Sequence, residues 1–480
     1  MSTLKVNNIE PTSGNSLIIS SSTVTIPGDL TVTGNINGNI SGSIEIGGFI
    51  SIAGGANQTM TVSGSLIVSG GNTFHNIGAM TTGFSNVVAS GSDAMAQGWY
   101  TTANGTGSHA EGGASIANGM ISHAEGGYFY YNPNVGLWYN ATIGGNAIGM
   151  GSHAEGVYTH AYGIGSHAEG GGTTANGDNS HAEGGYVTAS FDANTNTLTV
   201  LIANGGRTDA NGSHAEGADT RTLSTGWYSH AEGINSRTAG YGSHAEGTNT
   251  RTDGSGSHAE GYYTSASGNY SHAEGKETFA IGTYSHAEGE STSAQGTGSH
   301  AEGKTTFSIG NYSHAEGDGT QASGYVSHAE GTQTESQGTG SHAEGNETVA
   351  QGDYSHAEGN QTSAIGVNSH AEGNQTTALG QSSHAEGWGT IASGSYQHVI
   401  GTFNTQGDDS LRFIVGNGSG NSTRLDAFKV SNNNSIVIPQ TQSAAPFWTG
   451  TDGEMVFATV TGAHYFYVWM SGAWRSGSLA

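Results

Sequence analysis

The residues of this chain with the clearest chemical potential are histidine and glutamate, which recur two positions apart in the pentapeptide Ser-His-Ala-Glu-Gly. The pentapeptide occurs eighteen times, and its histidines run from His109 to His384. Residues i and i+2 of a β-strand share a face, so each histidine is expected to lie beside its glutamate. Three kinds of chemistry follow from these residue types: hydrogen bonding between the two side chains, metal binding, and catalysis that also uses the serine.

Catalysis has the least support. In an extended strand the serine faces away from the histidine and the glutamate, so the three side chains cannot form a triad. A polysaccharide depolymerase would need paired carboxylates in a groove, which chains lying side by side would have to supply. We therefore predict no enzyme activity, no catalytic residue and no cofactor, and keep a depolymerase as the least favoured alternative.

Metal binding is the stronger rival to ordinary hydrogen bonding. Histidine and glutamate on one face offer a nitrogen and an oxygen ligand, and several chains side by side would multiply both. We favour His–Glu hydrogen bonds and predict no metal site.

The spacing of the pentapeptide predicts the elements that carry it. From His230 to His384 the step is 14 residues eleven times in succession, with the pattern S-H-A-E-G-x-x-T-x-A-x-G-x-x. Fourteen residues hold two short strands and two tight turns, and we expect glycine to supply the positive φ of both corners. Coils stacked about 4.8 Å apart form a parallel β-roll, or β-solenoid. The predicted fold class is all-β.

Alternation within the strands predicts which side chains are inside. Ser and Ala of the pentapeptide face one way, and His and Glu face the other. In the second strand Thr278 and Ala280 are expected inside, while Phe279 and Ile281 occupy positions that vary between coils and are expected to face solvent. A core of Ala, Ser and Thr buries few apolar groups, so we expect several rolls to pack together through the constant His/Glu face.

With these features, about residues 92–401 resemble the head of trimeric autotransporter adhesins, whose 14-residue coils of the form S-V-A-I-G-x-x-S-x-A-x-G stack into a left-handed roll that trimerises. This chain differs by having His and Glu where those heads have apolar residues, and only Gln397-His-Val-Ile-Gly401 is similar to the apolar form. The resemblance implies a left-handed homotrimer.

We predict that the His/Glu face forms the trimer interface and that each histidine bonds a glutamate of a neighbouring chain, which would raise the histidine pKa. The interface residues predicted from the regular coils are His230, Glu232, His244, Glu246, His258, Glu260, His272, Glu274, His286, Glu288, His300, Glu302, His314 and Glu316.

The opening of the chain is similar to another family. Met1-Ser-Thr-Leu-Lys-Val-Asn-Asn-Ile-Glu-Pro-Thr-Ser-Gly14 resembles the start of tail-fibre proteins of tailed bacteriophages, particularly those infecting cyanobacteria, and Gly28-Asp-Leu-Thr-Val-Thr-Gly34 is similar to their shaft segments. The resemblance implies a virion tail fibre, made in the host cytoplasm and bound through its N-terminus to a tail or baseplate protein. Alternatives are a purely structural rod that carries another adhesin and a bacterial trimeric surface adhesin.

Composition agrees with a fibrous chain. Glycine accounts for 82 of 480 residues, there are 5 prolines, and charged residues make up 10%. A net charge of −27 disfavours binding to nucleic acid. The chain has no cysteine, which excludes disulfides and thiolate metal sites. No run reaches 18 apolar residues and neither a signal segment nor a terminal barrel pattern is recognised, so we expect no membrane insertion.

Four parts follow from these patterns: an attachment segment (1–27), a β-rich shaft (28–91), the roll (92–401) and a C-terminal β tail that serves as cap or tip (402–480). The step between pentapeptides grows by 16 residues after His123 and by 19 after His181, which predicts insertions near 128–144 and 186–205. We expect the second insertion to be a β-hairpin that turns at residues 193–196, and the tail to contain a small antiparallel meander.

Aromatic residues concentrate in the first insertion and in the tail. Exposed aromatics are enriched at recognition surfaces, so they are candidates for binding a host surface receptor, either a glycan or a protein. Packing against the roll or a neighbouring chain is the competing interpretation. The candidates are Tyr130, Tyr131, Trp138, Tyr139, Tyr465, Tyr467, Trp469 and Trp474.

A column of arginines is also predicted. Arg207, Arg221, Arg237 and Arg251 take the same position in successive coils. An aspartate stands two residues after the first and the last of them, so we favour neutralisation by aspartate over an anionic-glycan site.

Overall fold

The computed structural model describes residues 23–26, 30–32, 43–46, 50–52, 80–83, 87–127, 129–132, 137–140, 144–192, 197–203, 205–433, 435–437, 455–460 and 463–479. Regular structure in these ranges is entirely β-strand, which confirms the predicted all-β fold class. The described residues include no helix long and apolar enough to cross a membrane. The chain divides into two compact units, residues 1–75 and 76–480.

The first unit contains two pairs of short parallel strands. Strand β1 (Thr23–Ile26) pairs with β3 (Ser43–Ile46), and β2 (Leu30–Val32) pairs with β4 (Ile50–Ile52). In both pairs the partners are 20 positions apart in the chain, as in Thr23 opposite Ser43. The unit therefore contains parallel pairing with a period different from that of the roll.

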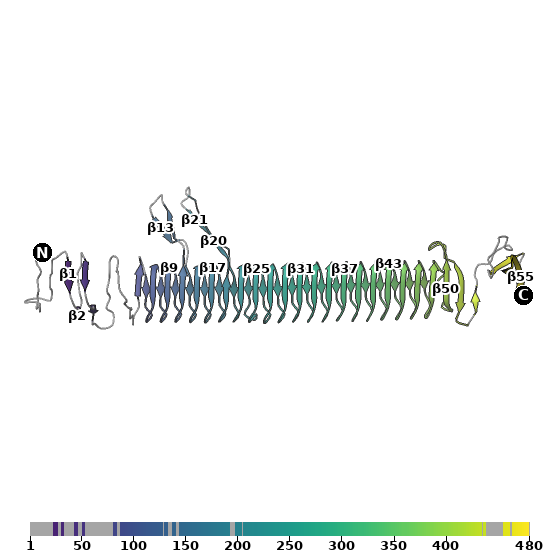
Figure 1. Cartoon of the computed structure of the whole chain (residues 1–480), viewed down its shortest axis with the longest axis horizontal. Coiled ribbons are helices and arrows are strands. Elements are labelled where there is room, and N and C mark those ends of the chain that lie inside the picture. Colours follow the sequence, from purple (N-terminus) through teal and green to yellow (C-terminus); the bar gives the residue numbers. More distant parts are fainter. Residues whose placement is uncertain are drawn as a thin grey trace, which may run out of the picture. The chain divides into compact units, whose positions relative to one another are not determined.

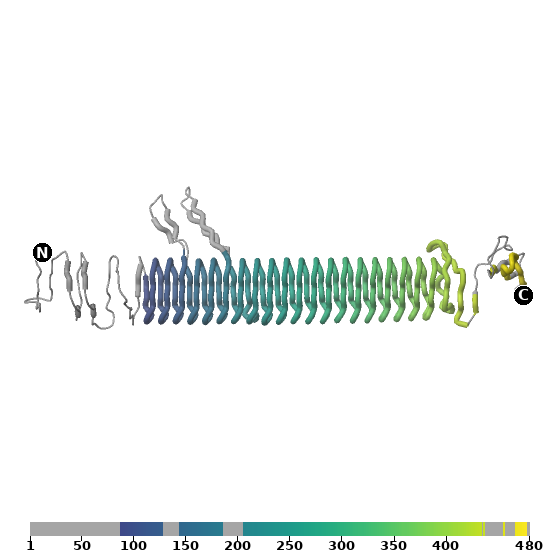
Figure 2. Tube along the Cα trace, in the orientation of Figure 1, coloured from purple at the N-terminus to yellow at the C-terminus, as the bar shows by residue number. Residues whose placement is uncertain are grey.

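The second unit is dominated by a parallel β-solenoid whose coil repeats every 14 residues (Figure 1). Each regular coil has one strand of five residues, which begins at the histidine of the pentapeptide, and one strand of two residues, which ends at the second small residue of the repeat. The register between coils places the constant residues of the repeat opposite their own kind: His272 lies opposite His286 and Ala280 opposite Ala294. The tube in Figure 2 follows this coil from turn to turn.

The longer strands form one sheet. Its parallel members, in spatial order, are β5 (Met80–Gly83), β7 (Met95–Trp99), β9 (His109–Gly113), β11 (His123–Gly126), β15 (His153–Val157), β17 (His167–Gly171), β19 (His181–Glu183), β23 (His214–Ala218), β25 (His230–Ile234), β27 (His244–Thr248), β29 (His258–Tyr262), β31 (His272–Lys276), β33 (His286–Glu290), β35 (His300–Lys304), β37 (His314–Asp318), β39 (His328–Thr332), β41 (His342–Asn346), β43 (His356–Asn360), β45 (His370–Asn374), β47 (His384–Trp388), β49 (His398–Thr402) and β50 (Leu411–Asn417).

The short strands form the second sheet. In spatial order they are β6 (Val88–Ala89), β8 (Thr102–Ala103), β10 (Ile116–Ala117), β14 (Asn146–Ala147), β16 (His160–Ala161), β18 (Thr174–Ala175), β22 (Arg207–Thr208), β24 (Arg221–Thr222), β26 (Arg237–Thr238), β28 (Arg251–Thr252), β30 (Ser265–Ala266), β32 (Phe279–Ala280), β34 (Ser293–Ala294), β36 (Phe307–Ser308), β38 (Gln321–Ala322), β40 (Glu335–Ser336), β42 (Val349–Ala350), β44 (Ser363–Ala364), β46 (Thr377–Ala378) and β48 (Ile391–Ala392).

The core between the two sheets is as thin as the sequence predicts. Ala273 and Ala280 are completely buried, and so are Ser271 and Thr278 to within 2%. The buried Ser271 hydroxyl donates a hydrogen bond to the Gly268 carbonyl oxygen at 2.7 Å, which fixes the corner before the long strand. The variable positions Phe279 and Ile281 are exposed, as expected.

The two corners of each coil are formed differently from the expectation. In the coil that begins at His272 the left-handed corner residues are Glu277 (φ 56°) and Tyr284 (φ 59°), whereas other coils have glycine at such a corner, as at Gly242 (φ 59°). Of the two repeat glycines, Gly275 has a positive φ of 110° but lies within the long strand, and Gly282 does not have one. A Cβ at Gly282 would lie 1.9 Å from the carbonyl oxygen of Gly296 in the next coil. Glycine is thus required for the close stacking of coils, and the prediction that it supplies both corners is wrong.

Both insertions leave the roll intact. Strand β11 pairs directly with β15, and β19 with β23, so the sheet continues in register across each insertion. The first insertion contains the antiparallel strands β12 (Phe129–Asn132) and β13 (Leu137–Asn140). The second contains β20 (Tyr186–Asp192) paired with β21 (Thr197–Ala203), which confirms the predicted hairpin.

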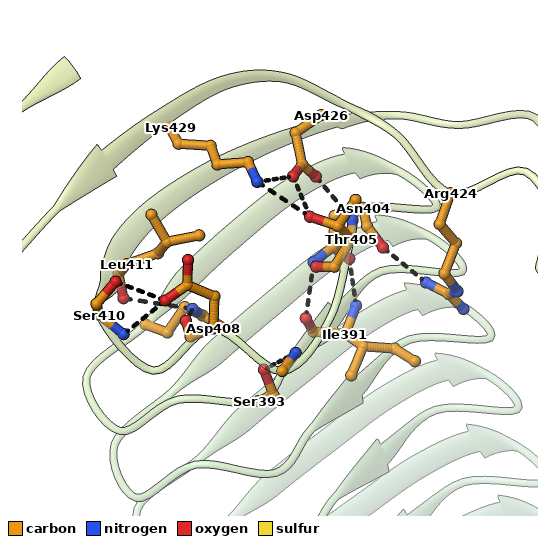
Figure 3. A network of polar contacts seen from close by, with 12 residues as sticks. Ile391, Ser393, Asn404, Thr405, Asp408, Ser410, Leu411, Arg424, Asp426 and Lys429 are labelled. Atoms are coloured by element: carbon orange, nitrogen blue, oxygen red, sulfur yellow. Dashed lines mark hydrogen bonds and ion pairs between the residues drawn. The ribbon is translucent and has the colours of Figure 1, made fainter. Parts of the chain in front are cut away.

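The solenoid ends in an antiparallel turn. After β50, strand β51 (Asp426–Ser431) pairs antiparallel with it, and β52 (Ile436–Val437) pairs antiparallel with β51. The short-strand sheet ends without a further strand: Figure 3 shows the Asn404 side chain against Ile391, the first residue of its last strand. The Asn404 side chain accepts a hydrogen bond from the Ile391 N–H at 2.7 Å and donates one to the Ile391 carbonyl at 2.9 Å.

Charged side chains hold this cap in place. Arg424 donates to the Gly389 and Asn404 carbonyl oxygens, at 2.7 and 3.2 Å. The buried Asp426 accepts a hydrogen bond from the Thr405 N–H at 2.7 Å and pairs with Lys429 at 2.5 Å (Figure 3). The edge of the roll is therefore closed by polar groups rather than left open for another strand.

The end of the chain forms a separate three-stranded antiparallel sheet, as predicted. Its strands are β53 (Met455–Val460), β54 (Ala463–Met470) and β55 (Ala473–Leu479).

Candidate functional site: a histidine–glutamate column

The eighteen His–Glu pairs from His109 and Glu111 to His384 and Glu386, here called the His–Glu column, lie on the outer face of the long-strand sheet. In each strand the alanine between the two residues is buried while the histidine and glutamate are partly exposed. The imidazole rings of adjacent coils stack face to face: His167 and His181 have ring centroids 4.7 Å apart and planes within 1°. The same stacking recurs from His109 to His398. The strand register therefore makes two continuous ladders, one of imidazoles and one of carboxylates.

From His123 onward, each pentapeptide histidine lies between two glutamates, its own and that of the preceding coil. His314 Nε2 is 3.7 Å from Glu316 Oε2 and 3.6 Å from Glu302 Oε1. These distances exceed the 2.7–3.2 Å usual for an N–H···O hydrogen bond. The Nε2 atoms of nearly all the column histidines are buried without a hydrogen-bond partner. Among the described coils, His384 is the one with a short contact, 3.1 Å from Glu372 Oε1.

Within the single chain, the pKa of several column histidines is lowered. Burial, followed by the neighbouring His230 and His181, lowers the pKa of His214 from 6.5 to about 4. The same two causes lower the pKa of His300 and His328. These shifts belong to the single chain, in which burial and then the neighbouring imidazoles disfavour the charged form, and the rise predicted for pairing with glutamates of neighbouring chains stays a prediction.

Some glutamates of the ladder have a pKa well above the usual range of a carboxyl group. Hydrogen bonds to the carboxyl groups of Glu316 and Glu288, together with burial, raise the pKa of Glu302 to about 7. Burial and a hydrogen bond to Glu169 raise the pKa of Glu183 to about 7. The pKa of Glu316, which takes the other side of the bond with Glu302, is lowered. In coupled pairs such as Glu302 and Glu316, a hydrogen bond between the two carboxyl groups thus raises the pKa of one and lowers that of the other.

The column also places metal-ligand atoms together. Two histidines of adjacent coils and the glutamate between them, such as His167, Glu169 and His181, have one ligand atom each within 4.8 Å of the others, and such triads recur along the column. A groove of about 640 Å³ runs beside the carboxylates, lined by glutamates from Glu274 to Glu316 and by the glycines that follow them.

All fourteen residues predicted for the trimer interface lie in this column, in the consecutive strands β25 to β37. The structure brings them into one line on one face. Whether that face meets another chain stays a prediction.

A second groove, of about 700 Å³, was not anticipated from the sequence. It lies along the short strands and the corner before them, and its walls include Arg251, Tyr263, Phe279 and Phe307. The variation of these positions between coils indicated solvent exposure but gave no sign that neighbouring aromatics would form a groove.

The receptor candidates of the first insertion are placed by backbone register. Tyr130 lies opposite Tyr139, and Tyr131 opposite Trp138, across the β12–β13 hairpin. All four therefore occupy two adjacent cross-strand pairs.

The candidates of the tail lie in its three-stranded sheet. Tyr465 and Tyr467 lie opposite Ser478 and Ser476, and Trp469 lies opposite Trp474. The two indole rings are 5.3 Å apart at 75°, an edge-to-face contact. Trp469 and Trp474 are half-buried, so part of their surface serves packing within the sheet.

Aspartates neutralise three of the four arginines of the column, as we predicted in preference to an anionic-glycan site. Asp209 accepts hydrogen bonds from Arg207 at 2.9 Å and Arg221 at 2.8 Å, and Arg251 pairs with Asp253 at 2.7 Å.

Comparison with known families supports an adhesin-like roll. Five segments of the roll match the YadA head domain repeat: residues 259–285, 287–313, 343–369, 357–383 and 371–396. YadA head repeats, a domain of trimeric autotransporter adhesins, are therefore present in this chain. No curated protein matches it. The matched segments lie in the regular part of the solenoid, where the His–Glu column is uninterrupted.

Proposed function

We propose that this chain forms a homotrimeric rod that attaches the particle or cell bearing it, here called the carrier, to the surface of a host cell. The observation that supports this best is the agreement between the 14-residue parallel roll and the YadA head repeats within it. The left-handed turn of the roll and the parallel arrangement of three chains belong to the same proposal.

The thin core gives a physical reason for a trimer. Coils filled by Ala, Ser and Thr bury little apolar surface per ordered residue, so a long roll gains by burying another face. The His–Glu column is the outer face whose composition stays constant through eighteen coils, and identical chains in parallel register would meet it with the same spacing.

Light scattering on the folded full chain tests the assembly. The expected mass is about three times 48.7 kDa. A mass near that of one chain at micromolar concentration would contradict the trimer.

We propose that the carrier is a tailed-phage virion, with the N-terminal segment bound to a tail or baseplate protein and the fibre outside the cell. The resemblance of residues 1–14 to tail-fibre openings supports this assignment. Immunogold electron microscopy with an antibody against the roll should label phage tails, and labelling of bacterial surfaces alone would contradict it.

A bacterial trimeric surface adhesin is the second candidate, and the YadA head repeats favour it specifically. The same microscopy separates the two candidates.

Receptor binding, to a glycan or a protein, is assigned to the first hairpin and the tail sheet. The alternative of a rod that only positions another adhesin predicts no binding by the purified chain. Binding of labelled full chain to host cells, with and without each segment, decides between them.

A further inference from the structure

The charge of the His–Glu column needs a counterpart that the chain itself does not provide. Carboxylates repeat at each coil, and the stacked imidazoles beside them are 4.5–4.9 Å apart. Lysine and arginine are absent from the two ladders along their whole length. Like charges at this spacing repel even in a high dielectric, so an external positive charge would stabilise the ladder.

Trimer formation does not remove this requirement. In the proposed trimer, where the columns of parallel chains face one another, the second and third copies would bring the same histidines and glutamates to the same level, and no new kind of charge. The counterpart must therefore be protons or a cation.

The donor set selects the kind of cation. Each site would have two imidazole nitrogens and one carboxylate oxygen, a set that suits Zn²⁺ and neighbouring transition ions better than Mg²⁺ or Ca²⁺, which prefer oxygen alone. The Nε2 atoms that would bind are buried and lack hydrogen-bond partners within the chain.

The distances are close to those of a tetrahedral site. Glu169 Oε2 is 3.5 Å from His167 Nε2, and Glu169 Oε1 is 4.0 Å from His181 Nε2. Ligands about 2.0–2.2 Å from a tetrahedral Zn²⁺ lie about 3.4 Å apart. The His167 and His181 rings are parallel with centroids 4.7 Å apart, so both imidazoles would have to tilt towards each other for their Nε2 lone pairs to meet on one ion, in addition to a shift of the glutamate oxygens by about 0.5 Å. The fourth position stays open to water or to a group of a neighbouring chain.

We propose that the His–Glu column is a tandem array of binding sites for a divalent transition-metal ion such as Zn²⁺, each made by two histidines of adjacent coils and the glutamate between them. Because each Nε2 binds one ion, adjacent triads that share a histidine exclude each other. The eighteen pentapeptide histidines, taken two at a time, allow nine ions. One divalent ion for every two glutamates also balances the charge of the ladder.

The first experiment uses the full chain, stripped with EDTA and dialysed against Zn²⁺ or Ca²⁺. We expect close to nine Zn²⁺ per chain by elemental analysis, and Zn²⁺ binding at least about 100-fold tighter than Ca²⁺. Co²⁺ should give the visible absorption of a tetrahedral nitrogen–oxygen site. Fewer than one Zn²⁺ per chain, or equal affinity for Ca²⁺, would overturn the proposal.

Two variants with the same number of His→Gln changes test the pairing rule. The alternating variant changes His244, His272, His300, His328, His356 and His384. The contiguous variant changes His244, His258, His272, His286, His300 and His314.

In the alternating variant, no histidine after His230 keeps a histidine in an adjacent coil, so none of them can form a site. The seven histidines from His109 to His230 still form three pairs, so the number of bound Zn²⁺ ions should fall from nine to about three. The contiguous variant keeps an unbroken run from His328 onward and should retain at least five. Equal capacities would mean that histidines bind singly and would overturn the array. His160→Gln, a half-buried histidine outside the column, should change nothing.

Folding and assembly are measured separately by circular dichroism and light scattering. If a variant does not fold, Zn²⁺ protection of the native histidines against diethylpyrocarbonate decides, because ions on Nε2 block the reaction. A trimer without Zn²⁺ binding contradicts this inference alone, and a monomer that binds Zn²⁺ contradicts only the proposed assembly.

Discussion

The side-chain amide of Asn404 takes the place of a neighbouring strand for Ile391, because it accepts from the Ile391 N–H at 2.7 Å and donates to the Ile391 carbonyl at 2.9 Å. It thereby satisfies the two backbone groups that the last short strand would otherwise present to solvent. The parallel sheet stops here because a side chain has completed its hydrogen bonds.

We expect Asn404→Ala to destabilise the C-terminal end of the roll by about 1–3 kcal/mol, since both Ile391 groups lose their partner. The open edge should also promote end-to-end association. Thermal melting and size-exclusion chromatography measure the two effects. Asn417→Ala, at an exposed position on β50, is the matched control and should leave both unchanged.

Gly282→Ala is expected to destabilise the roll by about 1–3 kcal/mol or more, because its Cβ would lie 1.9 Å from the Gly296 carbonyl oxygen and force two coils apart. The control is Gly242→Asn: Gly242 has a φ of 59° at a corner, and a Cβ there meets no atom within 4 Å. Asparagine tolerates this conformation, so the control should stay within about 0.5 kcal/mol of the wild type. Equal effects of the two changes would refute the stacking argument.

Acidification should destabilise the metal-free roll. A histidine such as His214, with its pKa lowered from 6.5 to about 4, binds fewer protons in the folded than in the unfolded chain between these values, so its contribution is lost as pH falls below 6.5. Glu302, with its pKa raised from 4.5 to about 7, acts in the opposite direction, since its contribution is lost as pH rises through that range. Lowered histidines are the more numerous along the column, so they should dominate.

Melting temperatures in EDTA between pH 7.5 and 5 test this expectation, and should be lower at pH 5. Changing His286, His300 and His328 to Gln should flatten the profile, because burial lowers the pKa of all three. A melting temperature that rises on acidification would show that the assembled protein protonates its histidines, as pairing with glutamates of neighbouring chains would require.

Deletion of residues 128–143 should leave the roll folded, because β11 already pairs with β15 across the insertion. The free energy of unfolding should change by less than about 1 kcal/mol, since a surface loop is removed. Adsorption to host cells should fall if the hairpin carries the receptor site. Deletion of residues 186–204, which removes the other hairpin, is the control and should leave adsorption unchanged. If neither deletion variant folds, the insertions support the roll.

Trp469→Ala should lower the stability of the tail sheet by about 1–3 kcal/mol through the loss of its buried surface and of the edge-to-face contact with Trp474. Met470→Ala, at an exposed neighbouring position, is the control. If adsorption falls while the near-ultraviolet circular dichroism of the sheet is kept, the tryptophan contacts the receptor. If both are lost together, its role is packing.

Periodicity in the sequence determined the coil of the roll and the direction of its side chains. The fixed Ala, Ser and Thr positions were identified as core, and His and Glu as outer residues, because alternation along a strand is a local property that each coil repeats. The hairpin at residues 186–203 and the terminal meander were also predicted from local patterns of strands and turns.

Contacts between coils were decided by the tertiary structure. Glu277 and Tyr284 turn the corners while Gly282 allows close stacking, since what glycine excludes is a Cβ facing the next coil. The lowered pKa of a histidine such as His300 also depends on the tertiary structure, since it comes from burial and then from the rings of His314 and His286 above and below it. The Asn404 cap had no sequence signal, because its partner Ile391 is defined only once the last coil has formed. The 14-residue spacing in the sequence determines which residue types recur in every coil. The distance of about 4.8 Å between coils determines which of these groups lie against each other, and this distance is a property of the folded roll.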